Sequence, residues 1–370
     1  MSAFAPSSLL PASPRHLILP FAACNAENWL PTVQALAPEA SRHLGQLLQG
    51  MQLMHTDDQQ AESLSPPHER ALARALGLAS EKTPDGLLPW AARDAAQHLP
   101  GGAGGKAWAW ITPCHWAMGH LHATLSDPAA LALQEDESRA LLAILQPYFE
   151  TDGITLHYAG ALGPGRWLAE GELLRKLPTA SLDRVLARNV DAWLPDAPQA
   201  APLRRLQNEM QMLLYIHPFN DARELKRQLP VNSFWISGTG DLPLESKEAP
   251  SPASPQGQTE PAGDAHALPA TDARPTAPAL TATAAQVSAP RSLAQAVFKE
   301  DWTAYAQAWQ ALDANELAPL LTRQRAGETV RLTLCGERSA QTFESRSPSL
   351  GTRLSRLFSP LRPLDILQQL

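Results

Sequence analysis

The sequence predicts an α/β protein with a mixed or mostly parallel sheet that carries helices on both faces. The chain has 370 residues, of which 44% are hydrophobic, so it can form a sizeable core. Short apolar runs typical of buried strands alternate with segments whose apolar residues recur every three or four positions, as in amphipathic helices. One long Pro/Ala-rich segment has neither pattern and interrupts the ordered part.

The first elements follow an N-terminal stretch, 1–15, that is rich in Ser, Pro and Ala and is expected to be loose. The apolar run 16–23 predicts the first buried strand. Leucines and other apolar residues at helical spacing predict helix within 27–55, and a second helix follows at 68–78 after two prolines. A glycine-rich loop then leads to alternating residues at 106–112, which predict a strand.

The central part of the chain continues this alternation. Asp127 before Pro128 is typical of a helix start, with Asp as the cap and Pro in the first turn. The same periodicities predict helices at 137–148, 181–194, 203–216 and 221–229, and strands at 154–158, 166–168 and 231–237.

Residues 243–290 hold Pro, Ala, Ser, Thr and Gln without an aromatic residue, so they cannot bury enough apolar area to fold and predict a disordered linker. Beyond it, Trp302, Tyr305 and Trp309 share one helix face, and 329–335 alternates as a strand does. We therefore expect five regions: a loose N-terminus (1–15), a main α/β domain (16–242), the linker (243–290), helices and a strand that complete the main domain (291–340) and a basic amphipathic tail (341–370).

Charge and composition exclude several classes of function. The formal net charge of -7 argues against a general nucleic-acid binder, which needs a basic surface. No apolar run approaches the roughly 20 residues of a membrane span. Cys24, Cys114 and Cys335 form no metal-binding or disulfide pattern, which favours the reducing cytoplasm.

Histidines are the first group of candidate site residues. His115, His120 and His122 lie within eight positions, and His217 follows in the next polar stretch. Imidazoles near a substrate serve as general acids or bases, so these four are candidate catalytic residues. Metal ligation, the lining of a pocket and ordinary packing are alternatives, and the spacing matches no zinc-protease motif.

The stretch 217–240 is the richest in polar groups around a predicted helix start and strand. Asn220, Arg223, Asn232 and Ser237 are candidate ligand-binding residues, because Arg223 can hold an anion with two hydrogen bonds. The alternative is structural: Asn220 caps a helix and Arg223 pairs with a neighbouring carboxylate.

The same stretch contains the pattern His217-Pro-x-Asn-x-x-Arg followed by Val231-Asn-Ser-Phe-Trp-Ile-Ser-Gly-x-Gly240. This pattern resembles a segment of archaeal-type cofactor-independent phosphoglycerate mutases. The whole chain is similar to bacterial RpfE-type regulatory proteins, which are loosely tied to those mutases. The features that suggest it are 16–23, Pro113-Cys-His-Trp116, Gly165-Arg-Trp167, 208–240 and Leu332-Thr-Leu-Cys-Gly-Glu-Arg338. The resemblance implies an α/β fold with a reduced alkaline-phosphatase-like sheet.

The resemblance also implies what the chain lacks. The mutases hold two divalent metal ions with Asp and His, and their first strand ends in a metal-binding Asp-Gly. Here that strand leads to Asn25 without a carboxylate, and the only histidine after His217 is His266, inside the predicted linker. Two metal ions need several carboxylates and imidazoles, so neither a divalent metal nor another cofactor is expected.

The predicted function is a non-catalytic regulatory or binding protein of the cytoplasm, related to phosphoglycerate mutases. Its expected partner is a phosphorylated small molecule or an unknown protein. Two alternatives stay open. One is an active mutase-like or phosphatase-like enzyme with the histidines as acid or base and Arg223 as anion clamp. The other is an interaction scaffold that uses the linker and the basic tail.

Overall fold

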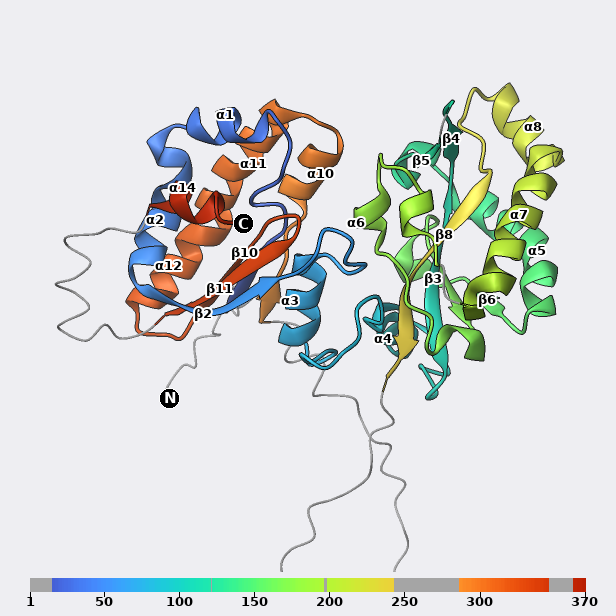
Figure 1. Ribbon diagram of the computed structural model, residues 1–370, viewed down its shortest axis with the longest axis horizontal. Coiled ribbons are helices and arrows are strands. Elements are labelled where there is room, and N and C mark those ends of the chain that lie inside the picture. The colour runs from blue at the N-terminus through green and yellow to red at the C-terminus, as the bar shows by residue number, and fades with distance from the viewer. Residues whose placement is uncertain (1–14, 121, 196–197, 243–285, 346–361) are drawn as a thin grey trace, which may run out of the picture.

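The computed structural model describes residues 15–120, 122–195, 198–242, 286–345 and 362–370. Most of the predicted linker, most of the basic tail and nearly all of the N-terminal stretch lie outside these residues. The described chain forms two lobes that lie side by side (Figure 1). We call residues 15–75 and those from 286 onward the first lobe, and residues 90–242 the second lobe. The predicted α/β class is confirmed.

The first lobe is built on a mixed five-stranded sheet in the order β2-β11-β10-β1-β9. Strand β1 is parallel to β10 and to β9, whereas β11 is antiparallel to β10 and to β2. The strands are β1 (His16–Leu19), β2 (Met51–Asp58), β9 (Val287–Ser288), β10 (Arg331–Cys335) and β11 (Ser339–Ser345). Its central strands, β1 and β10, therefore come from opposite ends of the sequence.

Helices cover both faces of this sheet, because successive side chains of β1 point to opposite sides. Leu17 and Leu19 pack into the large core on one face, whereas Ile18 packs against Ala71 of α3 on the other. The helices are α1 (Trp29–Gln34), α2 (Arg42–Gln49), α10 (Ser292–Phe298), α11 (Trp302–Leu312), α12 (Ala318–Arg325) and α14 (Pro363–Leu367) on the first face and α3 (Pro67–Ala75) on the second. The predicted stripe on α11 is confirmed, since Tyr305 and Trp309 are buried in the large core.

The helical prediction for 27–55 is wrong in its last part. Helix α2 ends at Gln49, and the residues after Gly50 form the edge strand β2. The segment Met51–Asp58 is mostly polar and exposed, so it lacks the alternation of a half-buried strand. Its conformation comes from pairing with β11, a partner almost 300 residues away that local periodicity cannot reveal.

The second lobe is built on an antiparallel four-stranded sheet in the order β6-β7-β3-β8. Its strands are β3 (Ala107–Cys114), β6 (Thr155–His157), β7 (Trp167–Glu170) and β8 (Ser233–Asp241), and a small separate pair is formed by β4 (Trp116–Met118) and β5 (Ala123–Leu125). The strands of the predicted 16–242 unit are thus divided between two sheets, and residues 287–345 supply strands to the first.

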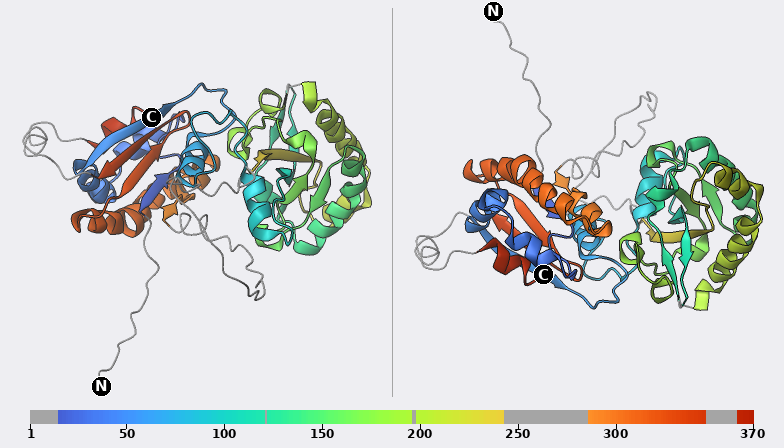
Figure 2. Two further views of the ribbon diagram at one scale, coloured as in Figure 1. Left: turned by 90° about the horizontal axis from the view of Figure 1, so that it is seen from below. Right: turned by 90° about the horizontal axis from the view of Figure 1, so that it is seen from above.

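Helices also flank the second sheet on both sides (Figure 2). Helices α5 (Glu135–Thr151) and α7 (Ala201–Tyr215) share one core with Ile111 of β3, whereas α4 (Trp90–His98) packs with Trp108 on the other side. Helix α8 (Pro218–Leu225) follows α7. Helix α5 has 17 residues, and no helix in the described ranges combines the length and apolar character that a bilayer crossing requires.

The predicted helix at 181–194 is wrong in extent, since α6 covers only Leu182–Val185. Leu186 already leaves the helical conformation with a ψ of 125°, and Ala187 after it has a left-handed φ of 58°. The short helix instead lies at the junction of the lobes. Arg184 donates to the Ser63 hydroxyl at 2.6 Å and to the Glu337 carbonyl at 2.7 Å, both in the first lobe.

Candidate binding site between the two lobes

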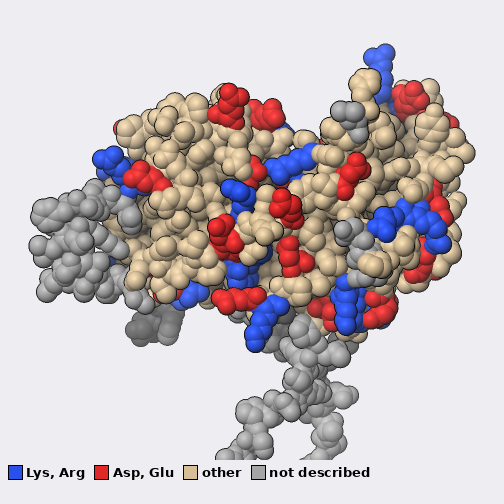
Figure 3. Space-filling model, viewed as in Figure 1, with Lys and Arg blue, Asp and Glu red and all other residues tan. Residues whose placement is uncertain are grey.

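A cavity of about 600 Å³ lies between the two lobes. Pro20, directly after the carboxyl end of β1, is part of its wall, and ligands of parallel sheets bind at this end of the strands. The other walls come from α3, α4, α6, β8, the start of α10 and the loop before β7. Charged side chains of both signs gather along the junction of the lobes (Figure 3).

Arg166 is a cationic side chain in the wall of the large cavity. It precedes β7, and its guanidinium lies 4.2 Å from the centre of the Trp110 ring. It forms neither an ion pair nor a hydrogen bond with any group in the described part of the chain. Burial lowers its pKa, and the charges of Asp94 and Glu69 oppose that shift. Arg166 is thus a half-buried cation with an open hydrogen-bonding edge.

Trp110 is fixed beneath Arg166 by its own contacts. The indole Nε1 donates to Asp94 of α4 at 2.9 Å, and burial raises the pKa of that carboxyl. Gly238 of β8 has a φ of 64°, and a Cβ at this position would lie 2.8 Å from the Trp110 ring. A side chain at Gly238 would therefore displace the ring that supports Arg166.

A cluster of polar side chains in the cavity wall spans the junction of the lobes. Asp183 of α6 contacts His68 of α3, with Nε2 to Oδ2 at 2.9 Å, and the Arg291 guanidinium at 2.6 and 2.8 Å. Ser181 donates to Glu69 at 2.5 Å. His68 and Glu69 start α3 in the first lobe, whereas Ser181 and Asp183 belong to the second, so the cluster exists only where the lobes meet.

The two carboxyls of this cluster titrate in opposite directions. Burial raises the pKa of Glu69, and the nearby charge of Asp183 adds to the shift. Burial acts the same way on Asp183, but the contacts with His68 and Arg291 outweigh it and hold the pKa of Asp183 far below its usual range. Asp183 is thus the fixed anion of the pair, and Glu69 is the carboxyl that can take up a proton.

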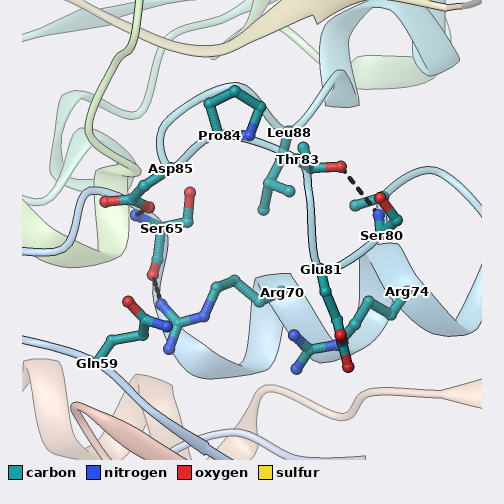
Figure 4. A pocket seen from close by; sticks show the side chains of 11 residues that line it. Gln59, Ser65, Arg70, Arg74, Ser80, Glu81, Thr83, Pro84, Asp85 and Leu88 are labelled. Carbon is teal, nitrogen blue, oxygen red and sulfur yellow. Dashed lines mark hydrogen bonds between the residues drawn. The ribbon is translucent and has the colours of Figure 1, made fainter.

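A smaller cavity of about 230 Å³ lies beside α3, under the loop that leads to the second lobe (Figure 4). Arg70 and Arg74 line it, but both pair with the buried Asp57, and Arg70 also donates to the Ser65 carbonyl. These contacts hold the pKa of Asp57 below its usual range against the effect of burial. Both arginines are therefore already paired with a carboxylate, unlike Arg166.

Of the predicted ligand-binding residues, Ser237 lines the large cavity. Asn220 bonds to the backbone of Leu214 and Val231, and Asn232 bonds to the amide and carbonyl of Trp116. Arg223 is 1% exposed and pairs with a carboxylate of α5. Binding by these three residues stays a prediction, and their side chains join elements of the second lobe.

The four predicted catalytic histidines are not among the residues that line the large cavity. His115 contacts the Pro230 carbonyl at 2.9 Å, and His217 accepts from the Phe219 amide at the start of α8. His120 and His122 are exposed near the turn between β4 and β5. A catalytic role for the four stays a prediction, and the structure does not bring them together at the cavity.

Five residues at the cavity were not predicted as site residues: His68, Glu69, Asp183, Arg166 and Arg291. They come from four separate segments, so no spacing rule joins them. Two signals were present: His68-Glu69 directly follows a Pro-Pro helix start, and Arg166 is part of the Gly165-Arg-Trp167 feature.

No family model matches the sequence, and no curated protein matches it. Among solved structures, a cofactor-independent phosphoglycerate mutase from Thermoplasma acidophilum is similar with a TM-score of 0.31 and 12% identity, covering 96% of this chain and 99% of that chain. The PH0037 protein from Pyrococcus horikoshii is similar with a TM-score of 0.38 and 11% identity, covering 90% and 87%. Likeness at this level is too low to transfer chemistry to this chain.

Proposed function

We propose that this chain is a regulatory or binding protein of the cytoplasm that holds a small phosphorylated molecule in the cavity between its lobes. The observation that carries the proposal is Arg166. A half-buried cation without an anionic partner is unfavourable, and an anionic ligand supplies that partner. The planar guanidinium matches the oxygens of a phosphate group with two parallel hydrogen bonds.

The surroundings of Arg166 fit a phosphate ester. Lys299 reaches the cavity from the first lobe, so an anion there is approached by cations of both lobes. The hydroxyls of Ser181 and Ser237 also line the cavity and offer neutral hydrogen bonds. A volume of about 600 Å³ lies in the range of small-molecule sites.

The test is a thermal-shift titration with inorganic phosphate and 3-phosphoglycerate, with glycerate as the unphosphorylated control. We expect both phosphorylated probes to raise the melting temperature and Arg166→Met to weaken binding at least about tenfold, or about 1.4 kcal/mol. The matched control is Arg139→Met, because Arg139 also lies over an aromatic ring, Tyr158 at 3.9 Å, but on the exposed surface. Equal binding by wild type and Arg166→Met would contradict the proposal.

The enzyme alternative has one supporting observation. The Ser181 hydroxyl donates to a carboxyl of raised pKa, which is the arrangement of a nucleophile and its base. The same incubations therefore include a measurement of released phosphate and of 2-phosphoglycerate. Turnover by the wild type would favour the phosphatase-like or mutase-like enzyme, whereas binding without turnover favours the regulatory protein. The scaffold alternative rests on segments that lie largely outside the described residues.

A further inference from the structure

One buried nitrogen on the α3 side of the cavity lacks the partner that buried polar groups normally have. His68 is 4% exposed, and its Nδ1 has no hydrogen-bond partner among the described residues. Glu69 receives one hydrogen bond from Ser181 and forms no ion pair within the part of the chain that the structure describes. A buried imidazole nitrogen without a partner thus lies beside a carboxyl without an ion pair, and both types of group can ligate a cation.

A third donor lies beside these two residues, since Asp183 Oδ2 is 2.9 Å from His68 Nε2. One ligand atom each of His68, Glu69 and Asp183 lie within 4.8 Å of one another. One nitrogen and two carboxylate oxygens form a donor set that suits a divalent ion such as Zn²⁺ or Mn²⁺ and leaves coordination positions open for water or a ligand. Because Asp183 comes from the second lobe, such an ion would bridge the two lobes.

A cation from the protein itself already contacts this donor set. The Arg291 guanidinium bonds to both oxygens of Asp183, so it balances that carboxylate directly, whereas it forms no ion pair with Glu69. The Arg291 side chain is 45% exposed, in contrast to the 5% of Asp183, and can leave toward solvent without unpacking the core. A divalent ion in place of the guanidinium would balance both carboxylates.

We propose that His68, Glu69 and Asp183 form a divalent-cation site in which Arg291 competes with the ion for Asp183. When Arg291 pairs with Asp183, its guanidinium blocks the ion from that carboxylate. When the ion is bound, the guanidinium is displaced from Asp183 into the cavity. This cation site uses other residues than Arg166 and its ring support, and its occupation does not require phosphate.

The test measures the affinity of the full chain for Mn²⁺ by electron paramagnetic resonance, in the absence of phosphate. Arg291→Met is expected to tighten Mn²⁺ binding at least about tenfold relative to wild type. The matched control is Arg188→Met, which removes another ion pair between the lobes, Arg188–Glu337 at 3.0 Å, without touching the three donors. Equal tightening by both variants, or none by Arg291→Met, would overturn the competition.

A second comparison tests the donors even if Arg291→Met fails to fold. Glu69→Gln in the wild-type background keeps the hydrogen bond from Ser181 but removes the charge, and we expect it to weaken Mn²⁺ binding at least about tenfold. Absence of Mn²⁺ binding by wild type, or an unchanged affinity in Glu69→Gln, would overturn the site. Arg166→Met removes a nearby cation, so it is expected to bind Mn²⁺ at least as tightly as wild type while it loses phosphate binding. Failure of the phosphate proposal and failure of this one therefore give different results.

Discussion

Arg223→Ala is expected to destabilise the second lobe strongly, because the side chain joins three segments while only 1% exposed. Its Nε donates to the Leu229 carbonyl at 2.9 Å, and Nη2 donates to the Leu131 carbonyl at 2.5 Å. Its Nη1 pairs with Glu137 of α5 at 2.9 Å. Truncation to alanine therefore removes two hydrogen bonds to backbone carbonyls and one ion pair, and it leaves a cavity.

The magnitude follows from these contacts. Breaking one partner of a buried ion pair costs about 3–5 kcal/mol, and each buried acceptor left without a donor costs about 1–3 kcal/mol. Glu137 keeps a second cation, Lys226 at 3.4 Å, and the Glu137 side chain is 12% exposed, so its carboxylate is not left unbalanced and the ion pair contributes only about 1 kcal/mol beside the two carbonyls. We expect a loss of about 3–5 kcal/mol, a large share of a typical domain stability of about 5–15 kcal/mol.

Urea denaturation monitored by tryptophan fluorescence measures this loss, with Lys226→Ala as the control. Lys226 pairs with the same Glu137 but is 61% exposed, so its removal should cost at most about 1 kcal/mol. If Arg223→Ala loses under about 1 kcal/mol and no longer responds to phosphate, the structural account is refuted and Arg223 is a ligand residue, as the sequence analysis predicted.

Two further predictions concern pH and the cavity wall. Burial, with the charge of Arg331, lowers the pKa of His16 to about 4, so the folded state keeps the imidazole neutral while the unfolded chain protonates near 6.5. The contribution of the neutral imidazole to stability is therefore complete above pH 6.5 and is lost as pH falls toward 4, by up to about 3 kcal/mol. Urea midpoints measured over a pH series should show this loss in wild type. His16→Gln should show a smaller change of the midpoint over the same pH range. Gly238→Ala should cost about 1–3 kcal/mol and weaken phosphate binding because it displaces Trp110. Gly102→Ala is its control, since Gly102 also has a positive φ but a Cβ there would meet no atom within 4 Å, and equal losses in the two variants would contradict the packing argument.

The elements that sequence analysis predicted well have strong local signals. The aromatic stripe of α11, the alternation of β10 and the Asp127 cap, whose side chain accepts from the Ala129 amide at 2.9 Å, all depend on neighbours within a few residues. The failures depend on distant partners. Strand β2 is defined by β11, and the division into two sheets is defined by the pairing of β1 with β10.

The candidate site was harder to predict for the same reason. Ser237 was identified because it lies in a polar stretch with a recognisable pattern, and it lines the cavity. Asn220 and Arg223 belong to that stretch too, but their side chains bond to elements inside the lobe. The residues that do meet at the cavity are brought together by the junction of the lobes, which no local pattern encodes.

The pairing of β1 with β10 also determines the order in which the two lobes can fold during translation. The ribosome releases β1 and β2 early, yet the strands that lie between them in the sheet are made roughly 270 residues later, a delay of tens of seconds at about 5–20 residues per second. The second lobe, complete by residue 242, can fold during this interval. Until β10 and β11 are synthesised, the incomplete first lobe exposes the apolar side of β1. We therefore expect chaperones that bind unfolded chains to bind this segment during translation.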